Sequence, residues 1–335
     1  MWQIGGFLLA IFVALAAAVF VTFLAYETQL SRIRNAASRG SVVAKLDAGP
    51  IEYVDNGVGP ALLSIHGAGG GFDQGLANAA DLVGEGFRII APSRFGYLRT
   101  PVPQDTSPAA QADAHAALLS KLGIPEAIVV GVSAGARSAV ELALRHPDKV
   151  TALVLIVPGL YSPTSPVSIE ASRGNRFAFW AVNAGGDFAW WAAEKIAPSV
   201  LVRFLGVPPT LVAAALPAEQ DRVMSIVESV EPLSLRFAGI NIDSTPALHE
   251  LPLEVITAPM IIISARDDLF NTLPAAEFAA AKIPGAKLVI YDTGGHLLVG
   301  RQQEVRMAVR MFLAGAGRIP SSESPDSQTR PARGQ

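Results

Sequence analysis

Apolar residues follow two patterns along the chain. Residues 4–26 form one continuous run without a charged side chain, whereas the later apolar runs are short and separated by polar stretches. A helix rises about 1.5 Å per residue, so the continuous run is long enough to cross a hydrocarbon core of about 30 Å. The pattern therefore predicts a transmembrane anchor over residues 1–27, followed by a globular domain.

The alternative for this first segment is a cleavable signal peptide. Such a peptide begins with a basic region and has an apolar core of about 7–15 residues. Residues 1–3 carry no basic side chain, and the apolar run here is longer. We therefore expect the segment to be retained, with the rings of Trp2 and Tyr26 near the two membrane interfaces. The flanking basic residues all follow the span, which places the globular domain in the cytoplasm by the positive-inside rule: Arg32, Arg34 and Arg39.

Short apolar runs alternate with helical patterns over the rest of the chain. Strands are expected at 41–46, 51–54, 61–65, 87–91, 127–130, 152–157, 260–263 and 287–291, and helices at 107–122, 134–146, 273–283 and 301–314. Strands of four to six residues with helices between them indicate an α/β fold, with a mostly parallel central sheet covered by helices on both faces. Its core is expected over residues 41–157 and 254–315, after a polar linker at 28–40.

The regular alternation is interrupted once, over residues 158–253. An insertion of this length in a compact fold is usually functional, and its prolines divide it into several helical stretches, so we expect a helical lid. Its aromatic residues are expected to form the core of the lid, to line an apolar acyl- or aryl-binding pocket, or to touch the membrane: Phe177, Phe179, Trp180, Phe188, Trp190, Trp191 and Phe204. The Pro- and Ser-rich residues 316–335 are expected to be a disordered tail.

Composition narrows the possible functions. The formal net charge is −3 and no long basic run is present, which argues against nucleic-acid binding. The chain has no cysteine, so disulfides, thiolate metal sites and a cysteine nucleophile are excluded. None of the five histidines is paired at the close helical spacing of a zinc site. We expect neither a metal nor a cofactor, and nothing in the sequence indicates the oligomeric state.

A candidate nucleophile lies in the pentapeptide Gly131-Val132-Ser133-Ala134-Gly135, which fits the pattern G-x-S-x-G. An apolar run precedes this pentapeptide and a helix-forming stretch follows it, as a strand–turn–helix nucleophile site requires. Small flanking residues allow the close backbone approach of such a turn. We therefore predict that Ser133 is the nucleophile of a serine hydrolase.

A serine hydroxyl needs a base, and the base needs a carboxylate that fixes its tautomer. His296 follows the last expected strand in the turn Thr293-Gly294-Gly295-His296, and it is the predicted base. Two acids, Asp267 and Asp268, follow the strand at 260–263. Asp268 is the preferred acid because, counted from Pro259 at the start of that strand, it lies where folds with this kind of nucleophile turn usually place the acid, and Asp267 remains the alternative.

Small residues also follow the strand at 61–65, in the stretch His66-Gly67-Ala68-Gly69-Gly70-Gly71. Their backbone N–H groups are expected to face the oxyanion of the transition state, and we assign this role to the amides of Ala68 and Ala134. The alternative, a dinucleotide-binding turn, lacks the G-x-G-x-x-G spacing. His66 is expected to be a structural hydrogen-bonding group.

The motifs HGAGGG, GVSAG, ARDD and GGH together resemble the α/β-hydrolase superfamily, in the order of that family and over residues 42–314. The loop Arg94-Phe95-Gly96-Tyr97 is also similar, although Ser93 replaces the family's usual aspartate. A serine nucleophile argues against the epoxide-hydrolase and dehalogenase branches, which use an aspartate at this position. The resemblance is to the lidded esterase, lipase and carbon–carbon hydrolase branch, and it implies an acyl-enzyme mechanism at Ser133.

Three functions remain open from the sequence. The first is a membrane-tethered carboxylesterase or lipase acting on a small apolar ester. The second is a hydrolase that cleaves a carbon–carbon bond in a diketone-like substrate. The third is a tethered, non-catalytic binding protein on a hydrolase scaffold, which the complete set of catalytic residues disfavours.

Overall fold

A computed structural model describes residues 2–164, 186–244 and 248–319 of the chain. Three predicted aromatic lid residues, Phe177, Phe179 and Trp180, lie outside these residues, as does most of the predicted tail at 316–335.

The core is an eight-stranded sheet with the order β1-β2-β4-β3-β5-β6-β7-β8. Strands β1 and β2 pair antiparallel, β2 is antiparallel to β4, and the remaining neighbours are parallel. The strands span Val42–Leu46, Gly49–Asn56, Ala61–Ile65, Arg88–Pro92, Ala127–Val132, Val150–Ile156, Met260–Ala265 and Lys287–Tyr291. The predicted mostly parallel sheet is confirmed.

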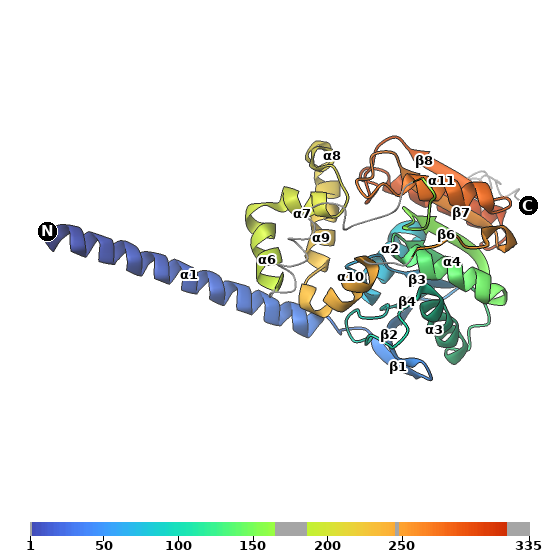
Figure 1. The fold of residues 1–335 in the computed structure, drawn as a ribbon, viewed down its shortest axis with the longest axis horizontal. Helices are drawn as coiled ribbons and strands as arrows, with labels where there is room; N and C mark the ends of the chain where they lie inside the picture. The colour runs from blue at the N-terminus through green and yellow to red at the C-terminus, as the bar shows by residue number, and fades with distance from the viewer. Residues whose placement is uncertain (1, 165–185, 245–247, 320–335) are drawn as a thin grey trace, which may run out of the picture.

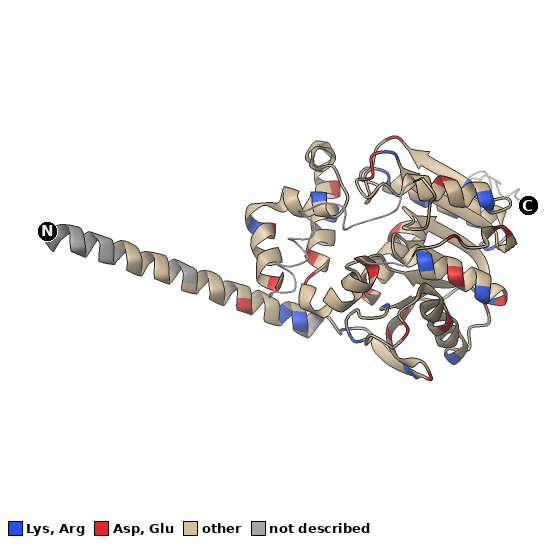
Figure 2. Cartoon of the chain, viewed as in Figure 1, with Lys and Arg blue, Asp and Glu red and all other residues tan. Residues whose placement is uncertain are grey.

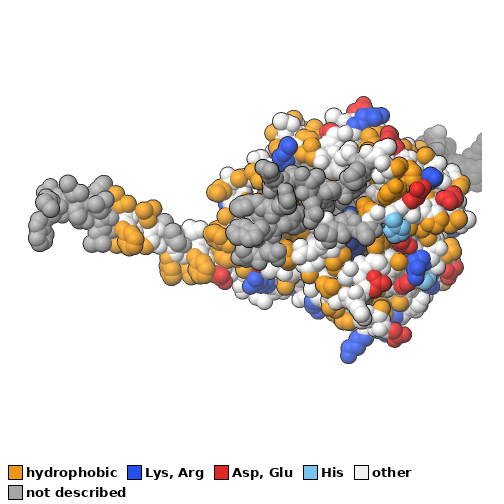
Figure 3. Space-filling model, in the orientation of Figure 1, with side chains coloured by type: hydrophobic (Ala, Val, Ile, Leu, Met, Phe, Trp, Pro, Cys, Tyr) orange, Lys and Arg blue, Asp and Glu red, His pale blue; other side chains and the backbone are white. Residues whose placement is uncertain are grey.

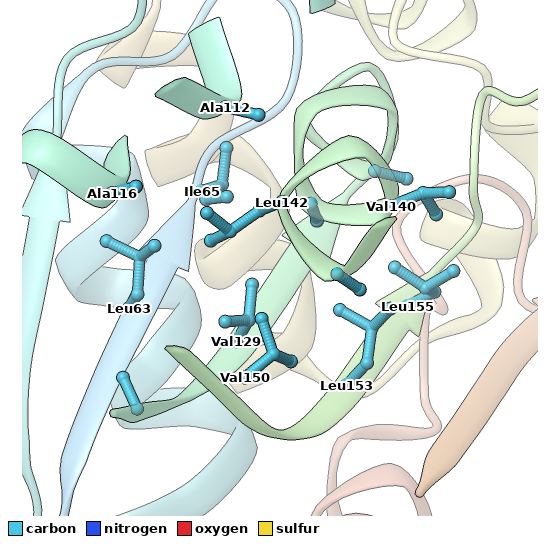
Figure 4. Packing of buried hydrophobic residues seen from close by; sticks show 14 of the residues in the cluster. Leu63, Ile65, Ala112, Ala116, Val129, Val140, Leu142, Val150, Leu153 and Leu155 are labelled. Atoms are coloured by element: carbon cyan, nitrogen blue, oxygen red, sulfur yellow. The ribbon is translucent and has the colours of Figure 1, made fainter. Parts of the chain in front are cut away.

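Helices cover both faces of this sheet (Figure 1). One face packs against α3 (Pro108–Lys121), α4 (Gly135–Arg145) and α11 (Leu273–Lys282), and the other packs against α2 (Phe72–Val83) and α12 (Gln302–Gly315). Side chains of β5 alternate between the two layers, since Val129 belongs to the first and Val130 to the second. Figure 4 shows the first layer, where side chains of α4 pack against those of the central strands. Burial on both faces explains why the central strands are almost continuously apolar.

A helical insertion (residues 186–244) lies between β6 and β7, and its elements are placed in Figure 1 between the N-terminal helix and the sheet. It has its own buried core, which includes Trp190, Val223 and Val227. The described elements are α6 (Gly186–Ile196), α7 (Pro198–Phe204), α8 (Pro209–Ala214), α9 (Pro217–Ser229), the short 3-10 helix η3 (Leu233–Leu235) and α10 (Phe237–Ser244). Two further 3-10 turns, η1 (Pro147–Lys149) and η4 (Leu253–Val255), belong to the core.

The N-terminal helix α1 runs from Trp2 to Ala36. By length and composition it is apolar enough to cross a membrane, with a candidate span at residues 11–35 and a mean hydropathy of 2.0. The helix projects from the globular part, and its described charged residues lie near the junction (Figures 2 and 3). Residues 28–40 were expected to be a linker, but the helix continues through this segment to Ala36. In these last turns Tyr26, Gln29 and Arg34 contact the insertion.

The carboxylate of Glu231, between α9 and η3, is a buried acid in the insertion. Burial and the neighbouring Glu194 raise its pKa to about 7, and Lys195 opposes this effect only in part. Asp187 and Glu228 are smaller contributors to the same rise. The folded chain therefore holds a proton at Glu231 that the unfolded chain loses above pH ~4.5.

This proton predicts a specific pH dependence of stability. Between pH ~4.5 and ~7 the folded state binds more protons than the unfolded state, so the free energy of unfolding falls as the pH rises. The drop from this group is about 3 kcal/mol. Glu231→Gln is expected to match the wild type at pH 5 and to be the more stable protein at pH 8. Thermal melts of both proteins across this range measure the difference, and parallel curves for the two proteins would contradict the prediction.

Candidate active site

Ser133 lies at the sharp turn between β5 and α4. Its backbone has a φ of +52°, a left-handed conformation that is uncommon for a residue with a side chain. The two flanking glycines permit the turn: a Cβ on Gly131 would lie 2.9 Å from the Cα of Ala136, and one on Gly135 would lie 2.5 Å from the carbonyl oxygen of Ile65. The turn therefore fixes the hydroxyl above the carboxyl end of the sheet, as the motif predicts.

The three residues expected to carry the chemistry form one hydrogen-bonded chain. The Oγ of Ser133 lies 2.9 Å from Nε2 of His296, and Nδ1 of that ring lies 2.8 Å from Oδ2 of Asp268. His296 and Asp268 are both buried, which keeps water from competing for these contacts. A hydroxyl, an imidazole and a carboxylate in this order suit proton transfer from the hydroxyl.

The two candidate acids have different partners. Asp268 contacts the imidazole and also accepts hydrogen bonds from the Thr272 hydroxyl and the Phe270 amide. Asp267 instead accepts the backbone N–H groups of Gly294 and Gly295, and so holds the turn that leads to the histidine. The structure thus places Asp268 at the imidazole and Asp267 in a supporting position.

The charge of Asp268 is maintained despite its burial. Burial alone would raise the pKa of this carboxyl, but His296 and the hydrogen bonds from Thr272 and Phe270 outweigh it and hold the pKa below its ordinary value. The carboxyl is therefore ionised at neutral pH and stabilises a protonated imidazole.

The insertion holds the backbone of His296, and Phe270 of the core holds its ring. The carbonyl oxygen of Gly206 accepts hydrogen bonds from the amides of His296 (3.1 Å) and Leu269 (3.1 Å). The ring of Phe270 packs edge-on against the imidazole at 4.6 Å. Gly206 has a φ of +79°, and a Cβ there would lie 2.7 Å from the Cβ of His296. Glycine is required at this contact, and no sequence motif pointed to it.

The two amides assigned to the oxyanion site, those of Ala68 and Ala134, belong to residues that line the same cavity as Ser133. No described group accepts a hydrogen bond from either amide. Ala134 also lies at the N-terminal end of α4, where backbone N–H groups are left unpaired and the helix dipole is positive. The position of both amides is suited to an oxyanion.

The ring of His66 is buried beside this loop and hydrogen-bonded to backbone groups. Burial, together with Arg94, lowers its pKa well below the ordinary value, so the ring is neutral. Its Nε2 accepts the amide N–H of Arg94, and its Nδ1 lies 2.7 Å from the carbonyl oxygen of Gly67. The Tyr97 hydroxyl accepts the amide of Gly69. These contacts agree with the structural role expected for His66.

A buried ion cluster joins the insertion to the core. Asp243 of α10 pairs with Arg94, which follows β4, and lies 3.6 Å from Arg137 of α4. It also accepts the Tyr97 hydroxyl. Although burial would raise the pKa of Asp243, Arg94, Arg137 and Tyr97 outweigh it and lower that pKa. The loop of Arg94 and Tyr97 had been noted in the sequence, whereas Asp243 gave no signal because its partners are distant along the chain.

The hydrogen-bonded chain opens into a cavity of about 330 Å³ between the core and the insertion. Ser133 and His296 lie on its core side. Apolar side chains of the insertion form much of the remaining wall: Trp190, Phe204, Leu205, Ile226, Val230 and Leu233. A cavity of this size and character suits a small apolar ligand. In the described part of the chain, no group of three or more histidine or acidic side chains is placed to hold a metal.

A family model of the alpha/beta hydrolase fold matches residues 60–300. The chain belongs to this family. Its likeness to known members is extensive but does not single out one reaction. This chain is 30% identical over 244 residues to a pimeloyl-acyl-carrier-protein methyl ester esterase of Aromatoleum aromaticum. The match covers 71% of this chain and 91% of the relative.

Two further relatives bear on the alternatives. A 2-hydroxymuconate semialdehyde hydrolase of Pseudomonas putida is 27% identical over 275 residues, which cover 80% of this chain and 92% of the relative. The solved structure of a membrane phospholipase A, described as a bacterial virulence factor, is 25% identical with a TM-score of 0.63. That match covers 93% of this chain and 99% of the other.

Proposed function

We propose that the protein is a membrane-anchored serine carboxylesterase that cleaves an apolar carboxylic ester through an acyl-enzyme at Ser133. The observation that carries this proposal is the hydrogen-bonded chain Ser133–His296–Asp268, which opens into a mostly apolar cavity. The esterase and phospholipase named above are consistent with it.

The mechanism has two steps. In the first, Nε2 of His296 takes the proton of the Ser133 hydroxyl as Oγ attacks the ester carbonyl carbon, and the amides of Ala68 and Ala134 stabilise the oxyanion. The C–O bond then breaks, and the imidazolium gives its proton to the departing alkoxide. In the second, His296 takes a proton from water, the resulting hydroxide attacks the acyl carbon, and Ser133 leaves with that proton.

A fluorophosphonate probe tests the nucleophile directly. Such probes phosphonylate activated serines, so we expect stoichiometric labelling of the wild type and none of Ser133→Ala. The matched control is Ser138→Ala, because this buried serine of α4 contacts His115 outside the cavity and its loss leaves labelling unchanged. Peptide mass spectrometry locates the label, and labelling that survives Ser133→Ala would overturn the proposal.

Carbon–carbon bond hydrolysis is the second candidate, supported by the similarity to the semialdehyde hydrolase. Assaying p-nitrophenyl esters of graded acyl length beside a ring-cleavage product such as 2-hydroxymuconate semialdehyde separates the two. We expect the esters to be turned over faster. A kcat/KM that is higher for the ring-cleavage product would favour the alternative.

Helix α1 is proposed as a retained anchor with the globular domain on the cytoplasmic side. Retention is supported by the packing of its C-terminal turns on the insertion, since cleavage after the apolar run would remove part of that contact. Alkaline carbonate extraction tests retention, and we expect the protein in the membrane pellet. A C-terminal tag tests the orientation, because protease should degrade it only in opened cells.

A further inference from the structure

The C-terminal turns of α1 dock on the helical insertion through a continuous stripe. Tyr26 and Leu30 are buried, and Gln29 and Ile33 are half-buried, so the contacting positions follow the i, i+3, i+4, i+7 spacing of one helix face. The described side chains that precede Tyr26 are exposed. The described part of the helix is therefore exposed before Tyr26 and contacts the insertion from Tyr26 onward.

Aromatic packing and one hydrogen bond form the first half of this contact. The ring of Tyr26 packs edge-on against Phe188 at 5.2 Å and lies 5.6 Å from the ring of Trp191, both on α6. The indole N–H of Trp191 donates to Oε1 of Gln29 at 2.9 Å. These contacts fix the position of α6 along α1.

The second half is centred on Asp187, at the start of α6. Its carboxylate accepts the amide and the hydroxyl of Ser234 at 2.8 and 2.6 Å, and it pairs with the Arg34 guanidinium at 3.1 Å. The Asp187 side chain is only 6% exposed, which strengthens the ion pair relative to one in water. One carboxylate thus joins three segments, namely α1, α6 and η3.

The same two segments of the insertion form the cavity wall. Trp190 precedes Trp191 and lines the cavity, where its indole N–H donates to the carbonyl oxygen of Val227. Leu233 precedes Ser234 and also lines it. Adjacent residues of α6 and η3 therefore contact α1 on one side and the cavity on the other, so a shift of the docked helix moves the wall.

We propose that Tyr26, Gln29 and Arg34 of α1 are positioning residues for the substrate: they hold the cavity wall at Trp190 and Leu233, and so set the preference for long acyl chains. This inference rests on the proposed esterase function, since it assigns the wall to an acyl chain. A long chain fills the cavity as far as the insertion, whereas an acetyl group occupies only the space beside Ser133. The anchor helix is thus a structural part of the substrate site.

The test uses the full chain in nanodiscs of one fixed lipid composition, so that partitioning of the ester into lipid is equal for all variants. For Gln29→Ala/Arg34→Ala we expect a five- to tenfold higher KM for p-nitrophenyl decanoate and a kcat within twofold of the wild type. The kcat/KM for p-nitrophenyl acetate is expected to stay within twofold. An equal loss for both esters, or no change for either, would overturn the inference.

Two further variants separate positioning from general stability. The single variant Arg34→Lys keeps Gln29 and retains a cation that reaches Asp187. We expect it to retain at least half of the preference for decanoate that the double variant loses. Arg32→Ala removes an exposed arginine two residues away on the same helix, and we expect wild-type kinetics. If Arg32→Ala raised the KM for decanoate as much as the double variant does, the change would come from the lost charge alone, and the inference would be overturned.

Labelling rates separate this inference from the proposed function. Fluorophosphonates with ethyl and decyl chains react with Ser133 in one turnover, so they report on the cavity without ester hydrolysis. The double variant is expected to slow the decyl probe at least fivefold and the ethyl probe less than twofold. If the probes label the wild type but it hydrolyses no ester, the esterase proposal fails. The ratio of the decyl to the ethyl labelling rate, compared between wild type and double variant, still decides the inference. A wild type that neither labels nor hydrolyses esters would overturn both.

Discussion

Replacing Asp268 by asparagine is expected to lower kcat by about 10⁴-fold, with little change in KM. The amide cannot stabilise the imidazolium that forms as Ser133 loses its proton, and its N–H₂ group favours the wrong tautomer of His296. The effect is large because the 2.8 Å contact of His296 Nδ1 with Asp268 is buried. Steady-state kinetics with a p-nitrophenyl ester measure it.

The neighbouring acid supplies the control. The amides of Gly294 and Gly295 donate to different oxygens of Asp267, and Asp267→Asn retains an acceptor for one of them. We expect kcat to fall by less than about tenfold, because the imidazole keeps Asp268. If Asp267→Asn showed the large loss of kcat and Asp268→Asn the small one, Asp267 would be the acid. Comparable modest losses in both would show that neither carboxylate assists the histidine.

Replacing Asp243 by alanine is expected to destabilise the fold by about 3–5 kcal/mol. The substitution removes the carboxylate that pairs with Arg94 and leaves this buried guanidinium without a counter-charge. The nearby guanidinium of Arg137 loses the same carboxylate at 3.6 Å. At roughly 2–4 °C per kcal/mol for a domain of this size class, Tm falls by roughly 6–20 °C.

An exposed pair provides the comparison for this variant. Asp113 pairs with Arg145 at 2.6 Å, but both side chains are more than 40% exposed. Asp113→Ala should therefore cost less than about 1 kcal/mol. Differential scanning fluorimetry of the two variants beside the wild type checks the contrast. Equal Tm values for Asp243→Ala and Asp113→Ala would show that the buried cluster does not hold the insertion on the core.

The loop after β3, which holds the proposed oxyanion donor Ala68, is expected to respond to Asp243→Ala as well. Tyr97 donates its hydroxyl to Asp243 and accepts the amide of Gly69, so the ion cluster and the loop share one residue. Arg94 likewise contacts both Asp243 and His66. Loss of the cluster therefore affects the donors of the active site as well as global stability.

Local sequence was sufficient where the structural determinants are local. Ser133 could be located because a strand, a turn of small residues and a helix are consecutive in the chain, and each leaves its own pattern. The strands of the parallel core could be found for the same reason, because burial on both faces requires continuous apolar runs. The polar composition of the expected linker at 28–40 gave no sign that the helix continues to Ala36, or that Gln29, Leu30 and Ile33 are partly or fully buried.

Contacts between distant segments left no comparable signal. The choice between Asp267 and Asp268 depends on which way two adjacent side chains point after β7, and packing against a loop 28 residues further on decides it. Gly206 meets His296, and Asp243 meets Arg94, across separations of 90 and 149 residues. Partners this far apart can be matched only once the chain has folded.

The sequence by itself determined the strand–turn–helix at Ser133, the mostly parallel core and an apolar N-terminal helix, because each depends on neighbouring residues and on the periodicity of burial. Only the tertiary structure decided which acid contacts His296 and how the insertion is held against the core. It also decided that the last turns of α1 pack on α6 and η3, whose neighbouring residues Trp190 and Leu233 line the cavity. The physical reason is that these contacts depend on the relative placement of elements, which long-range packing sets.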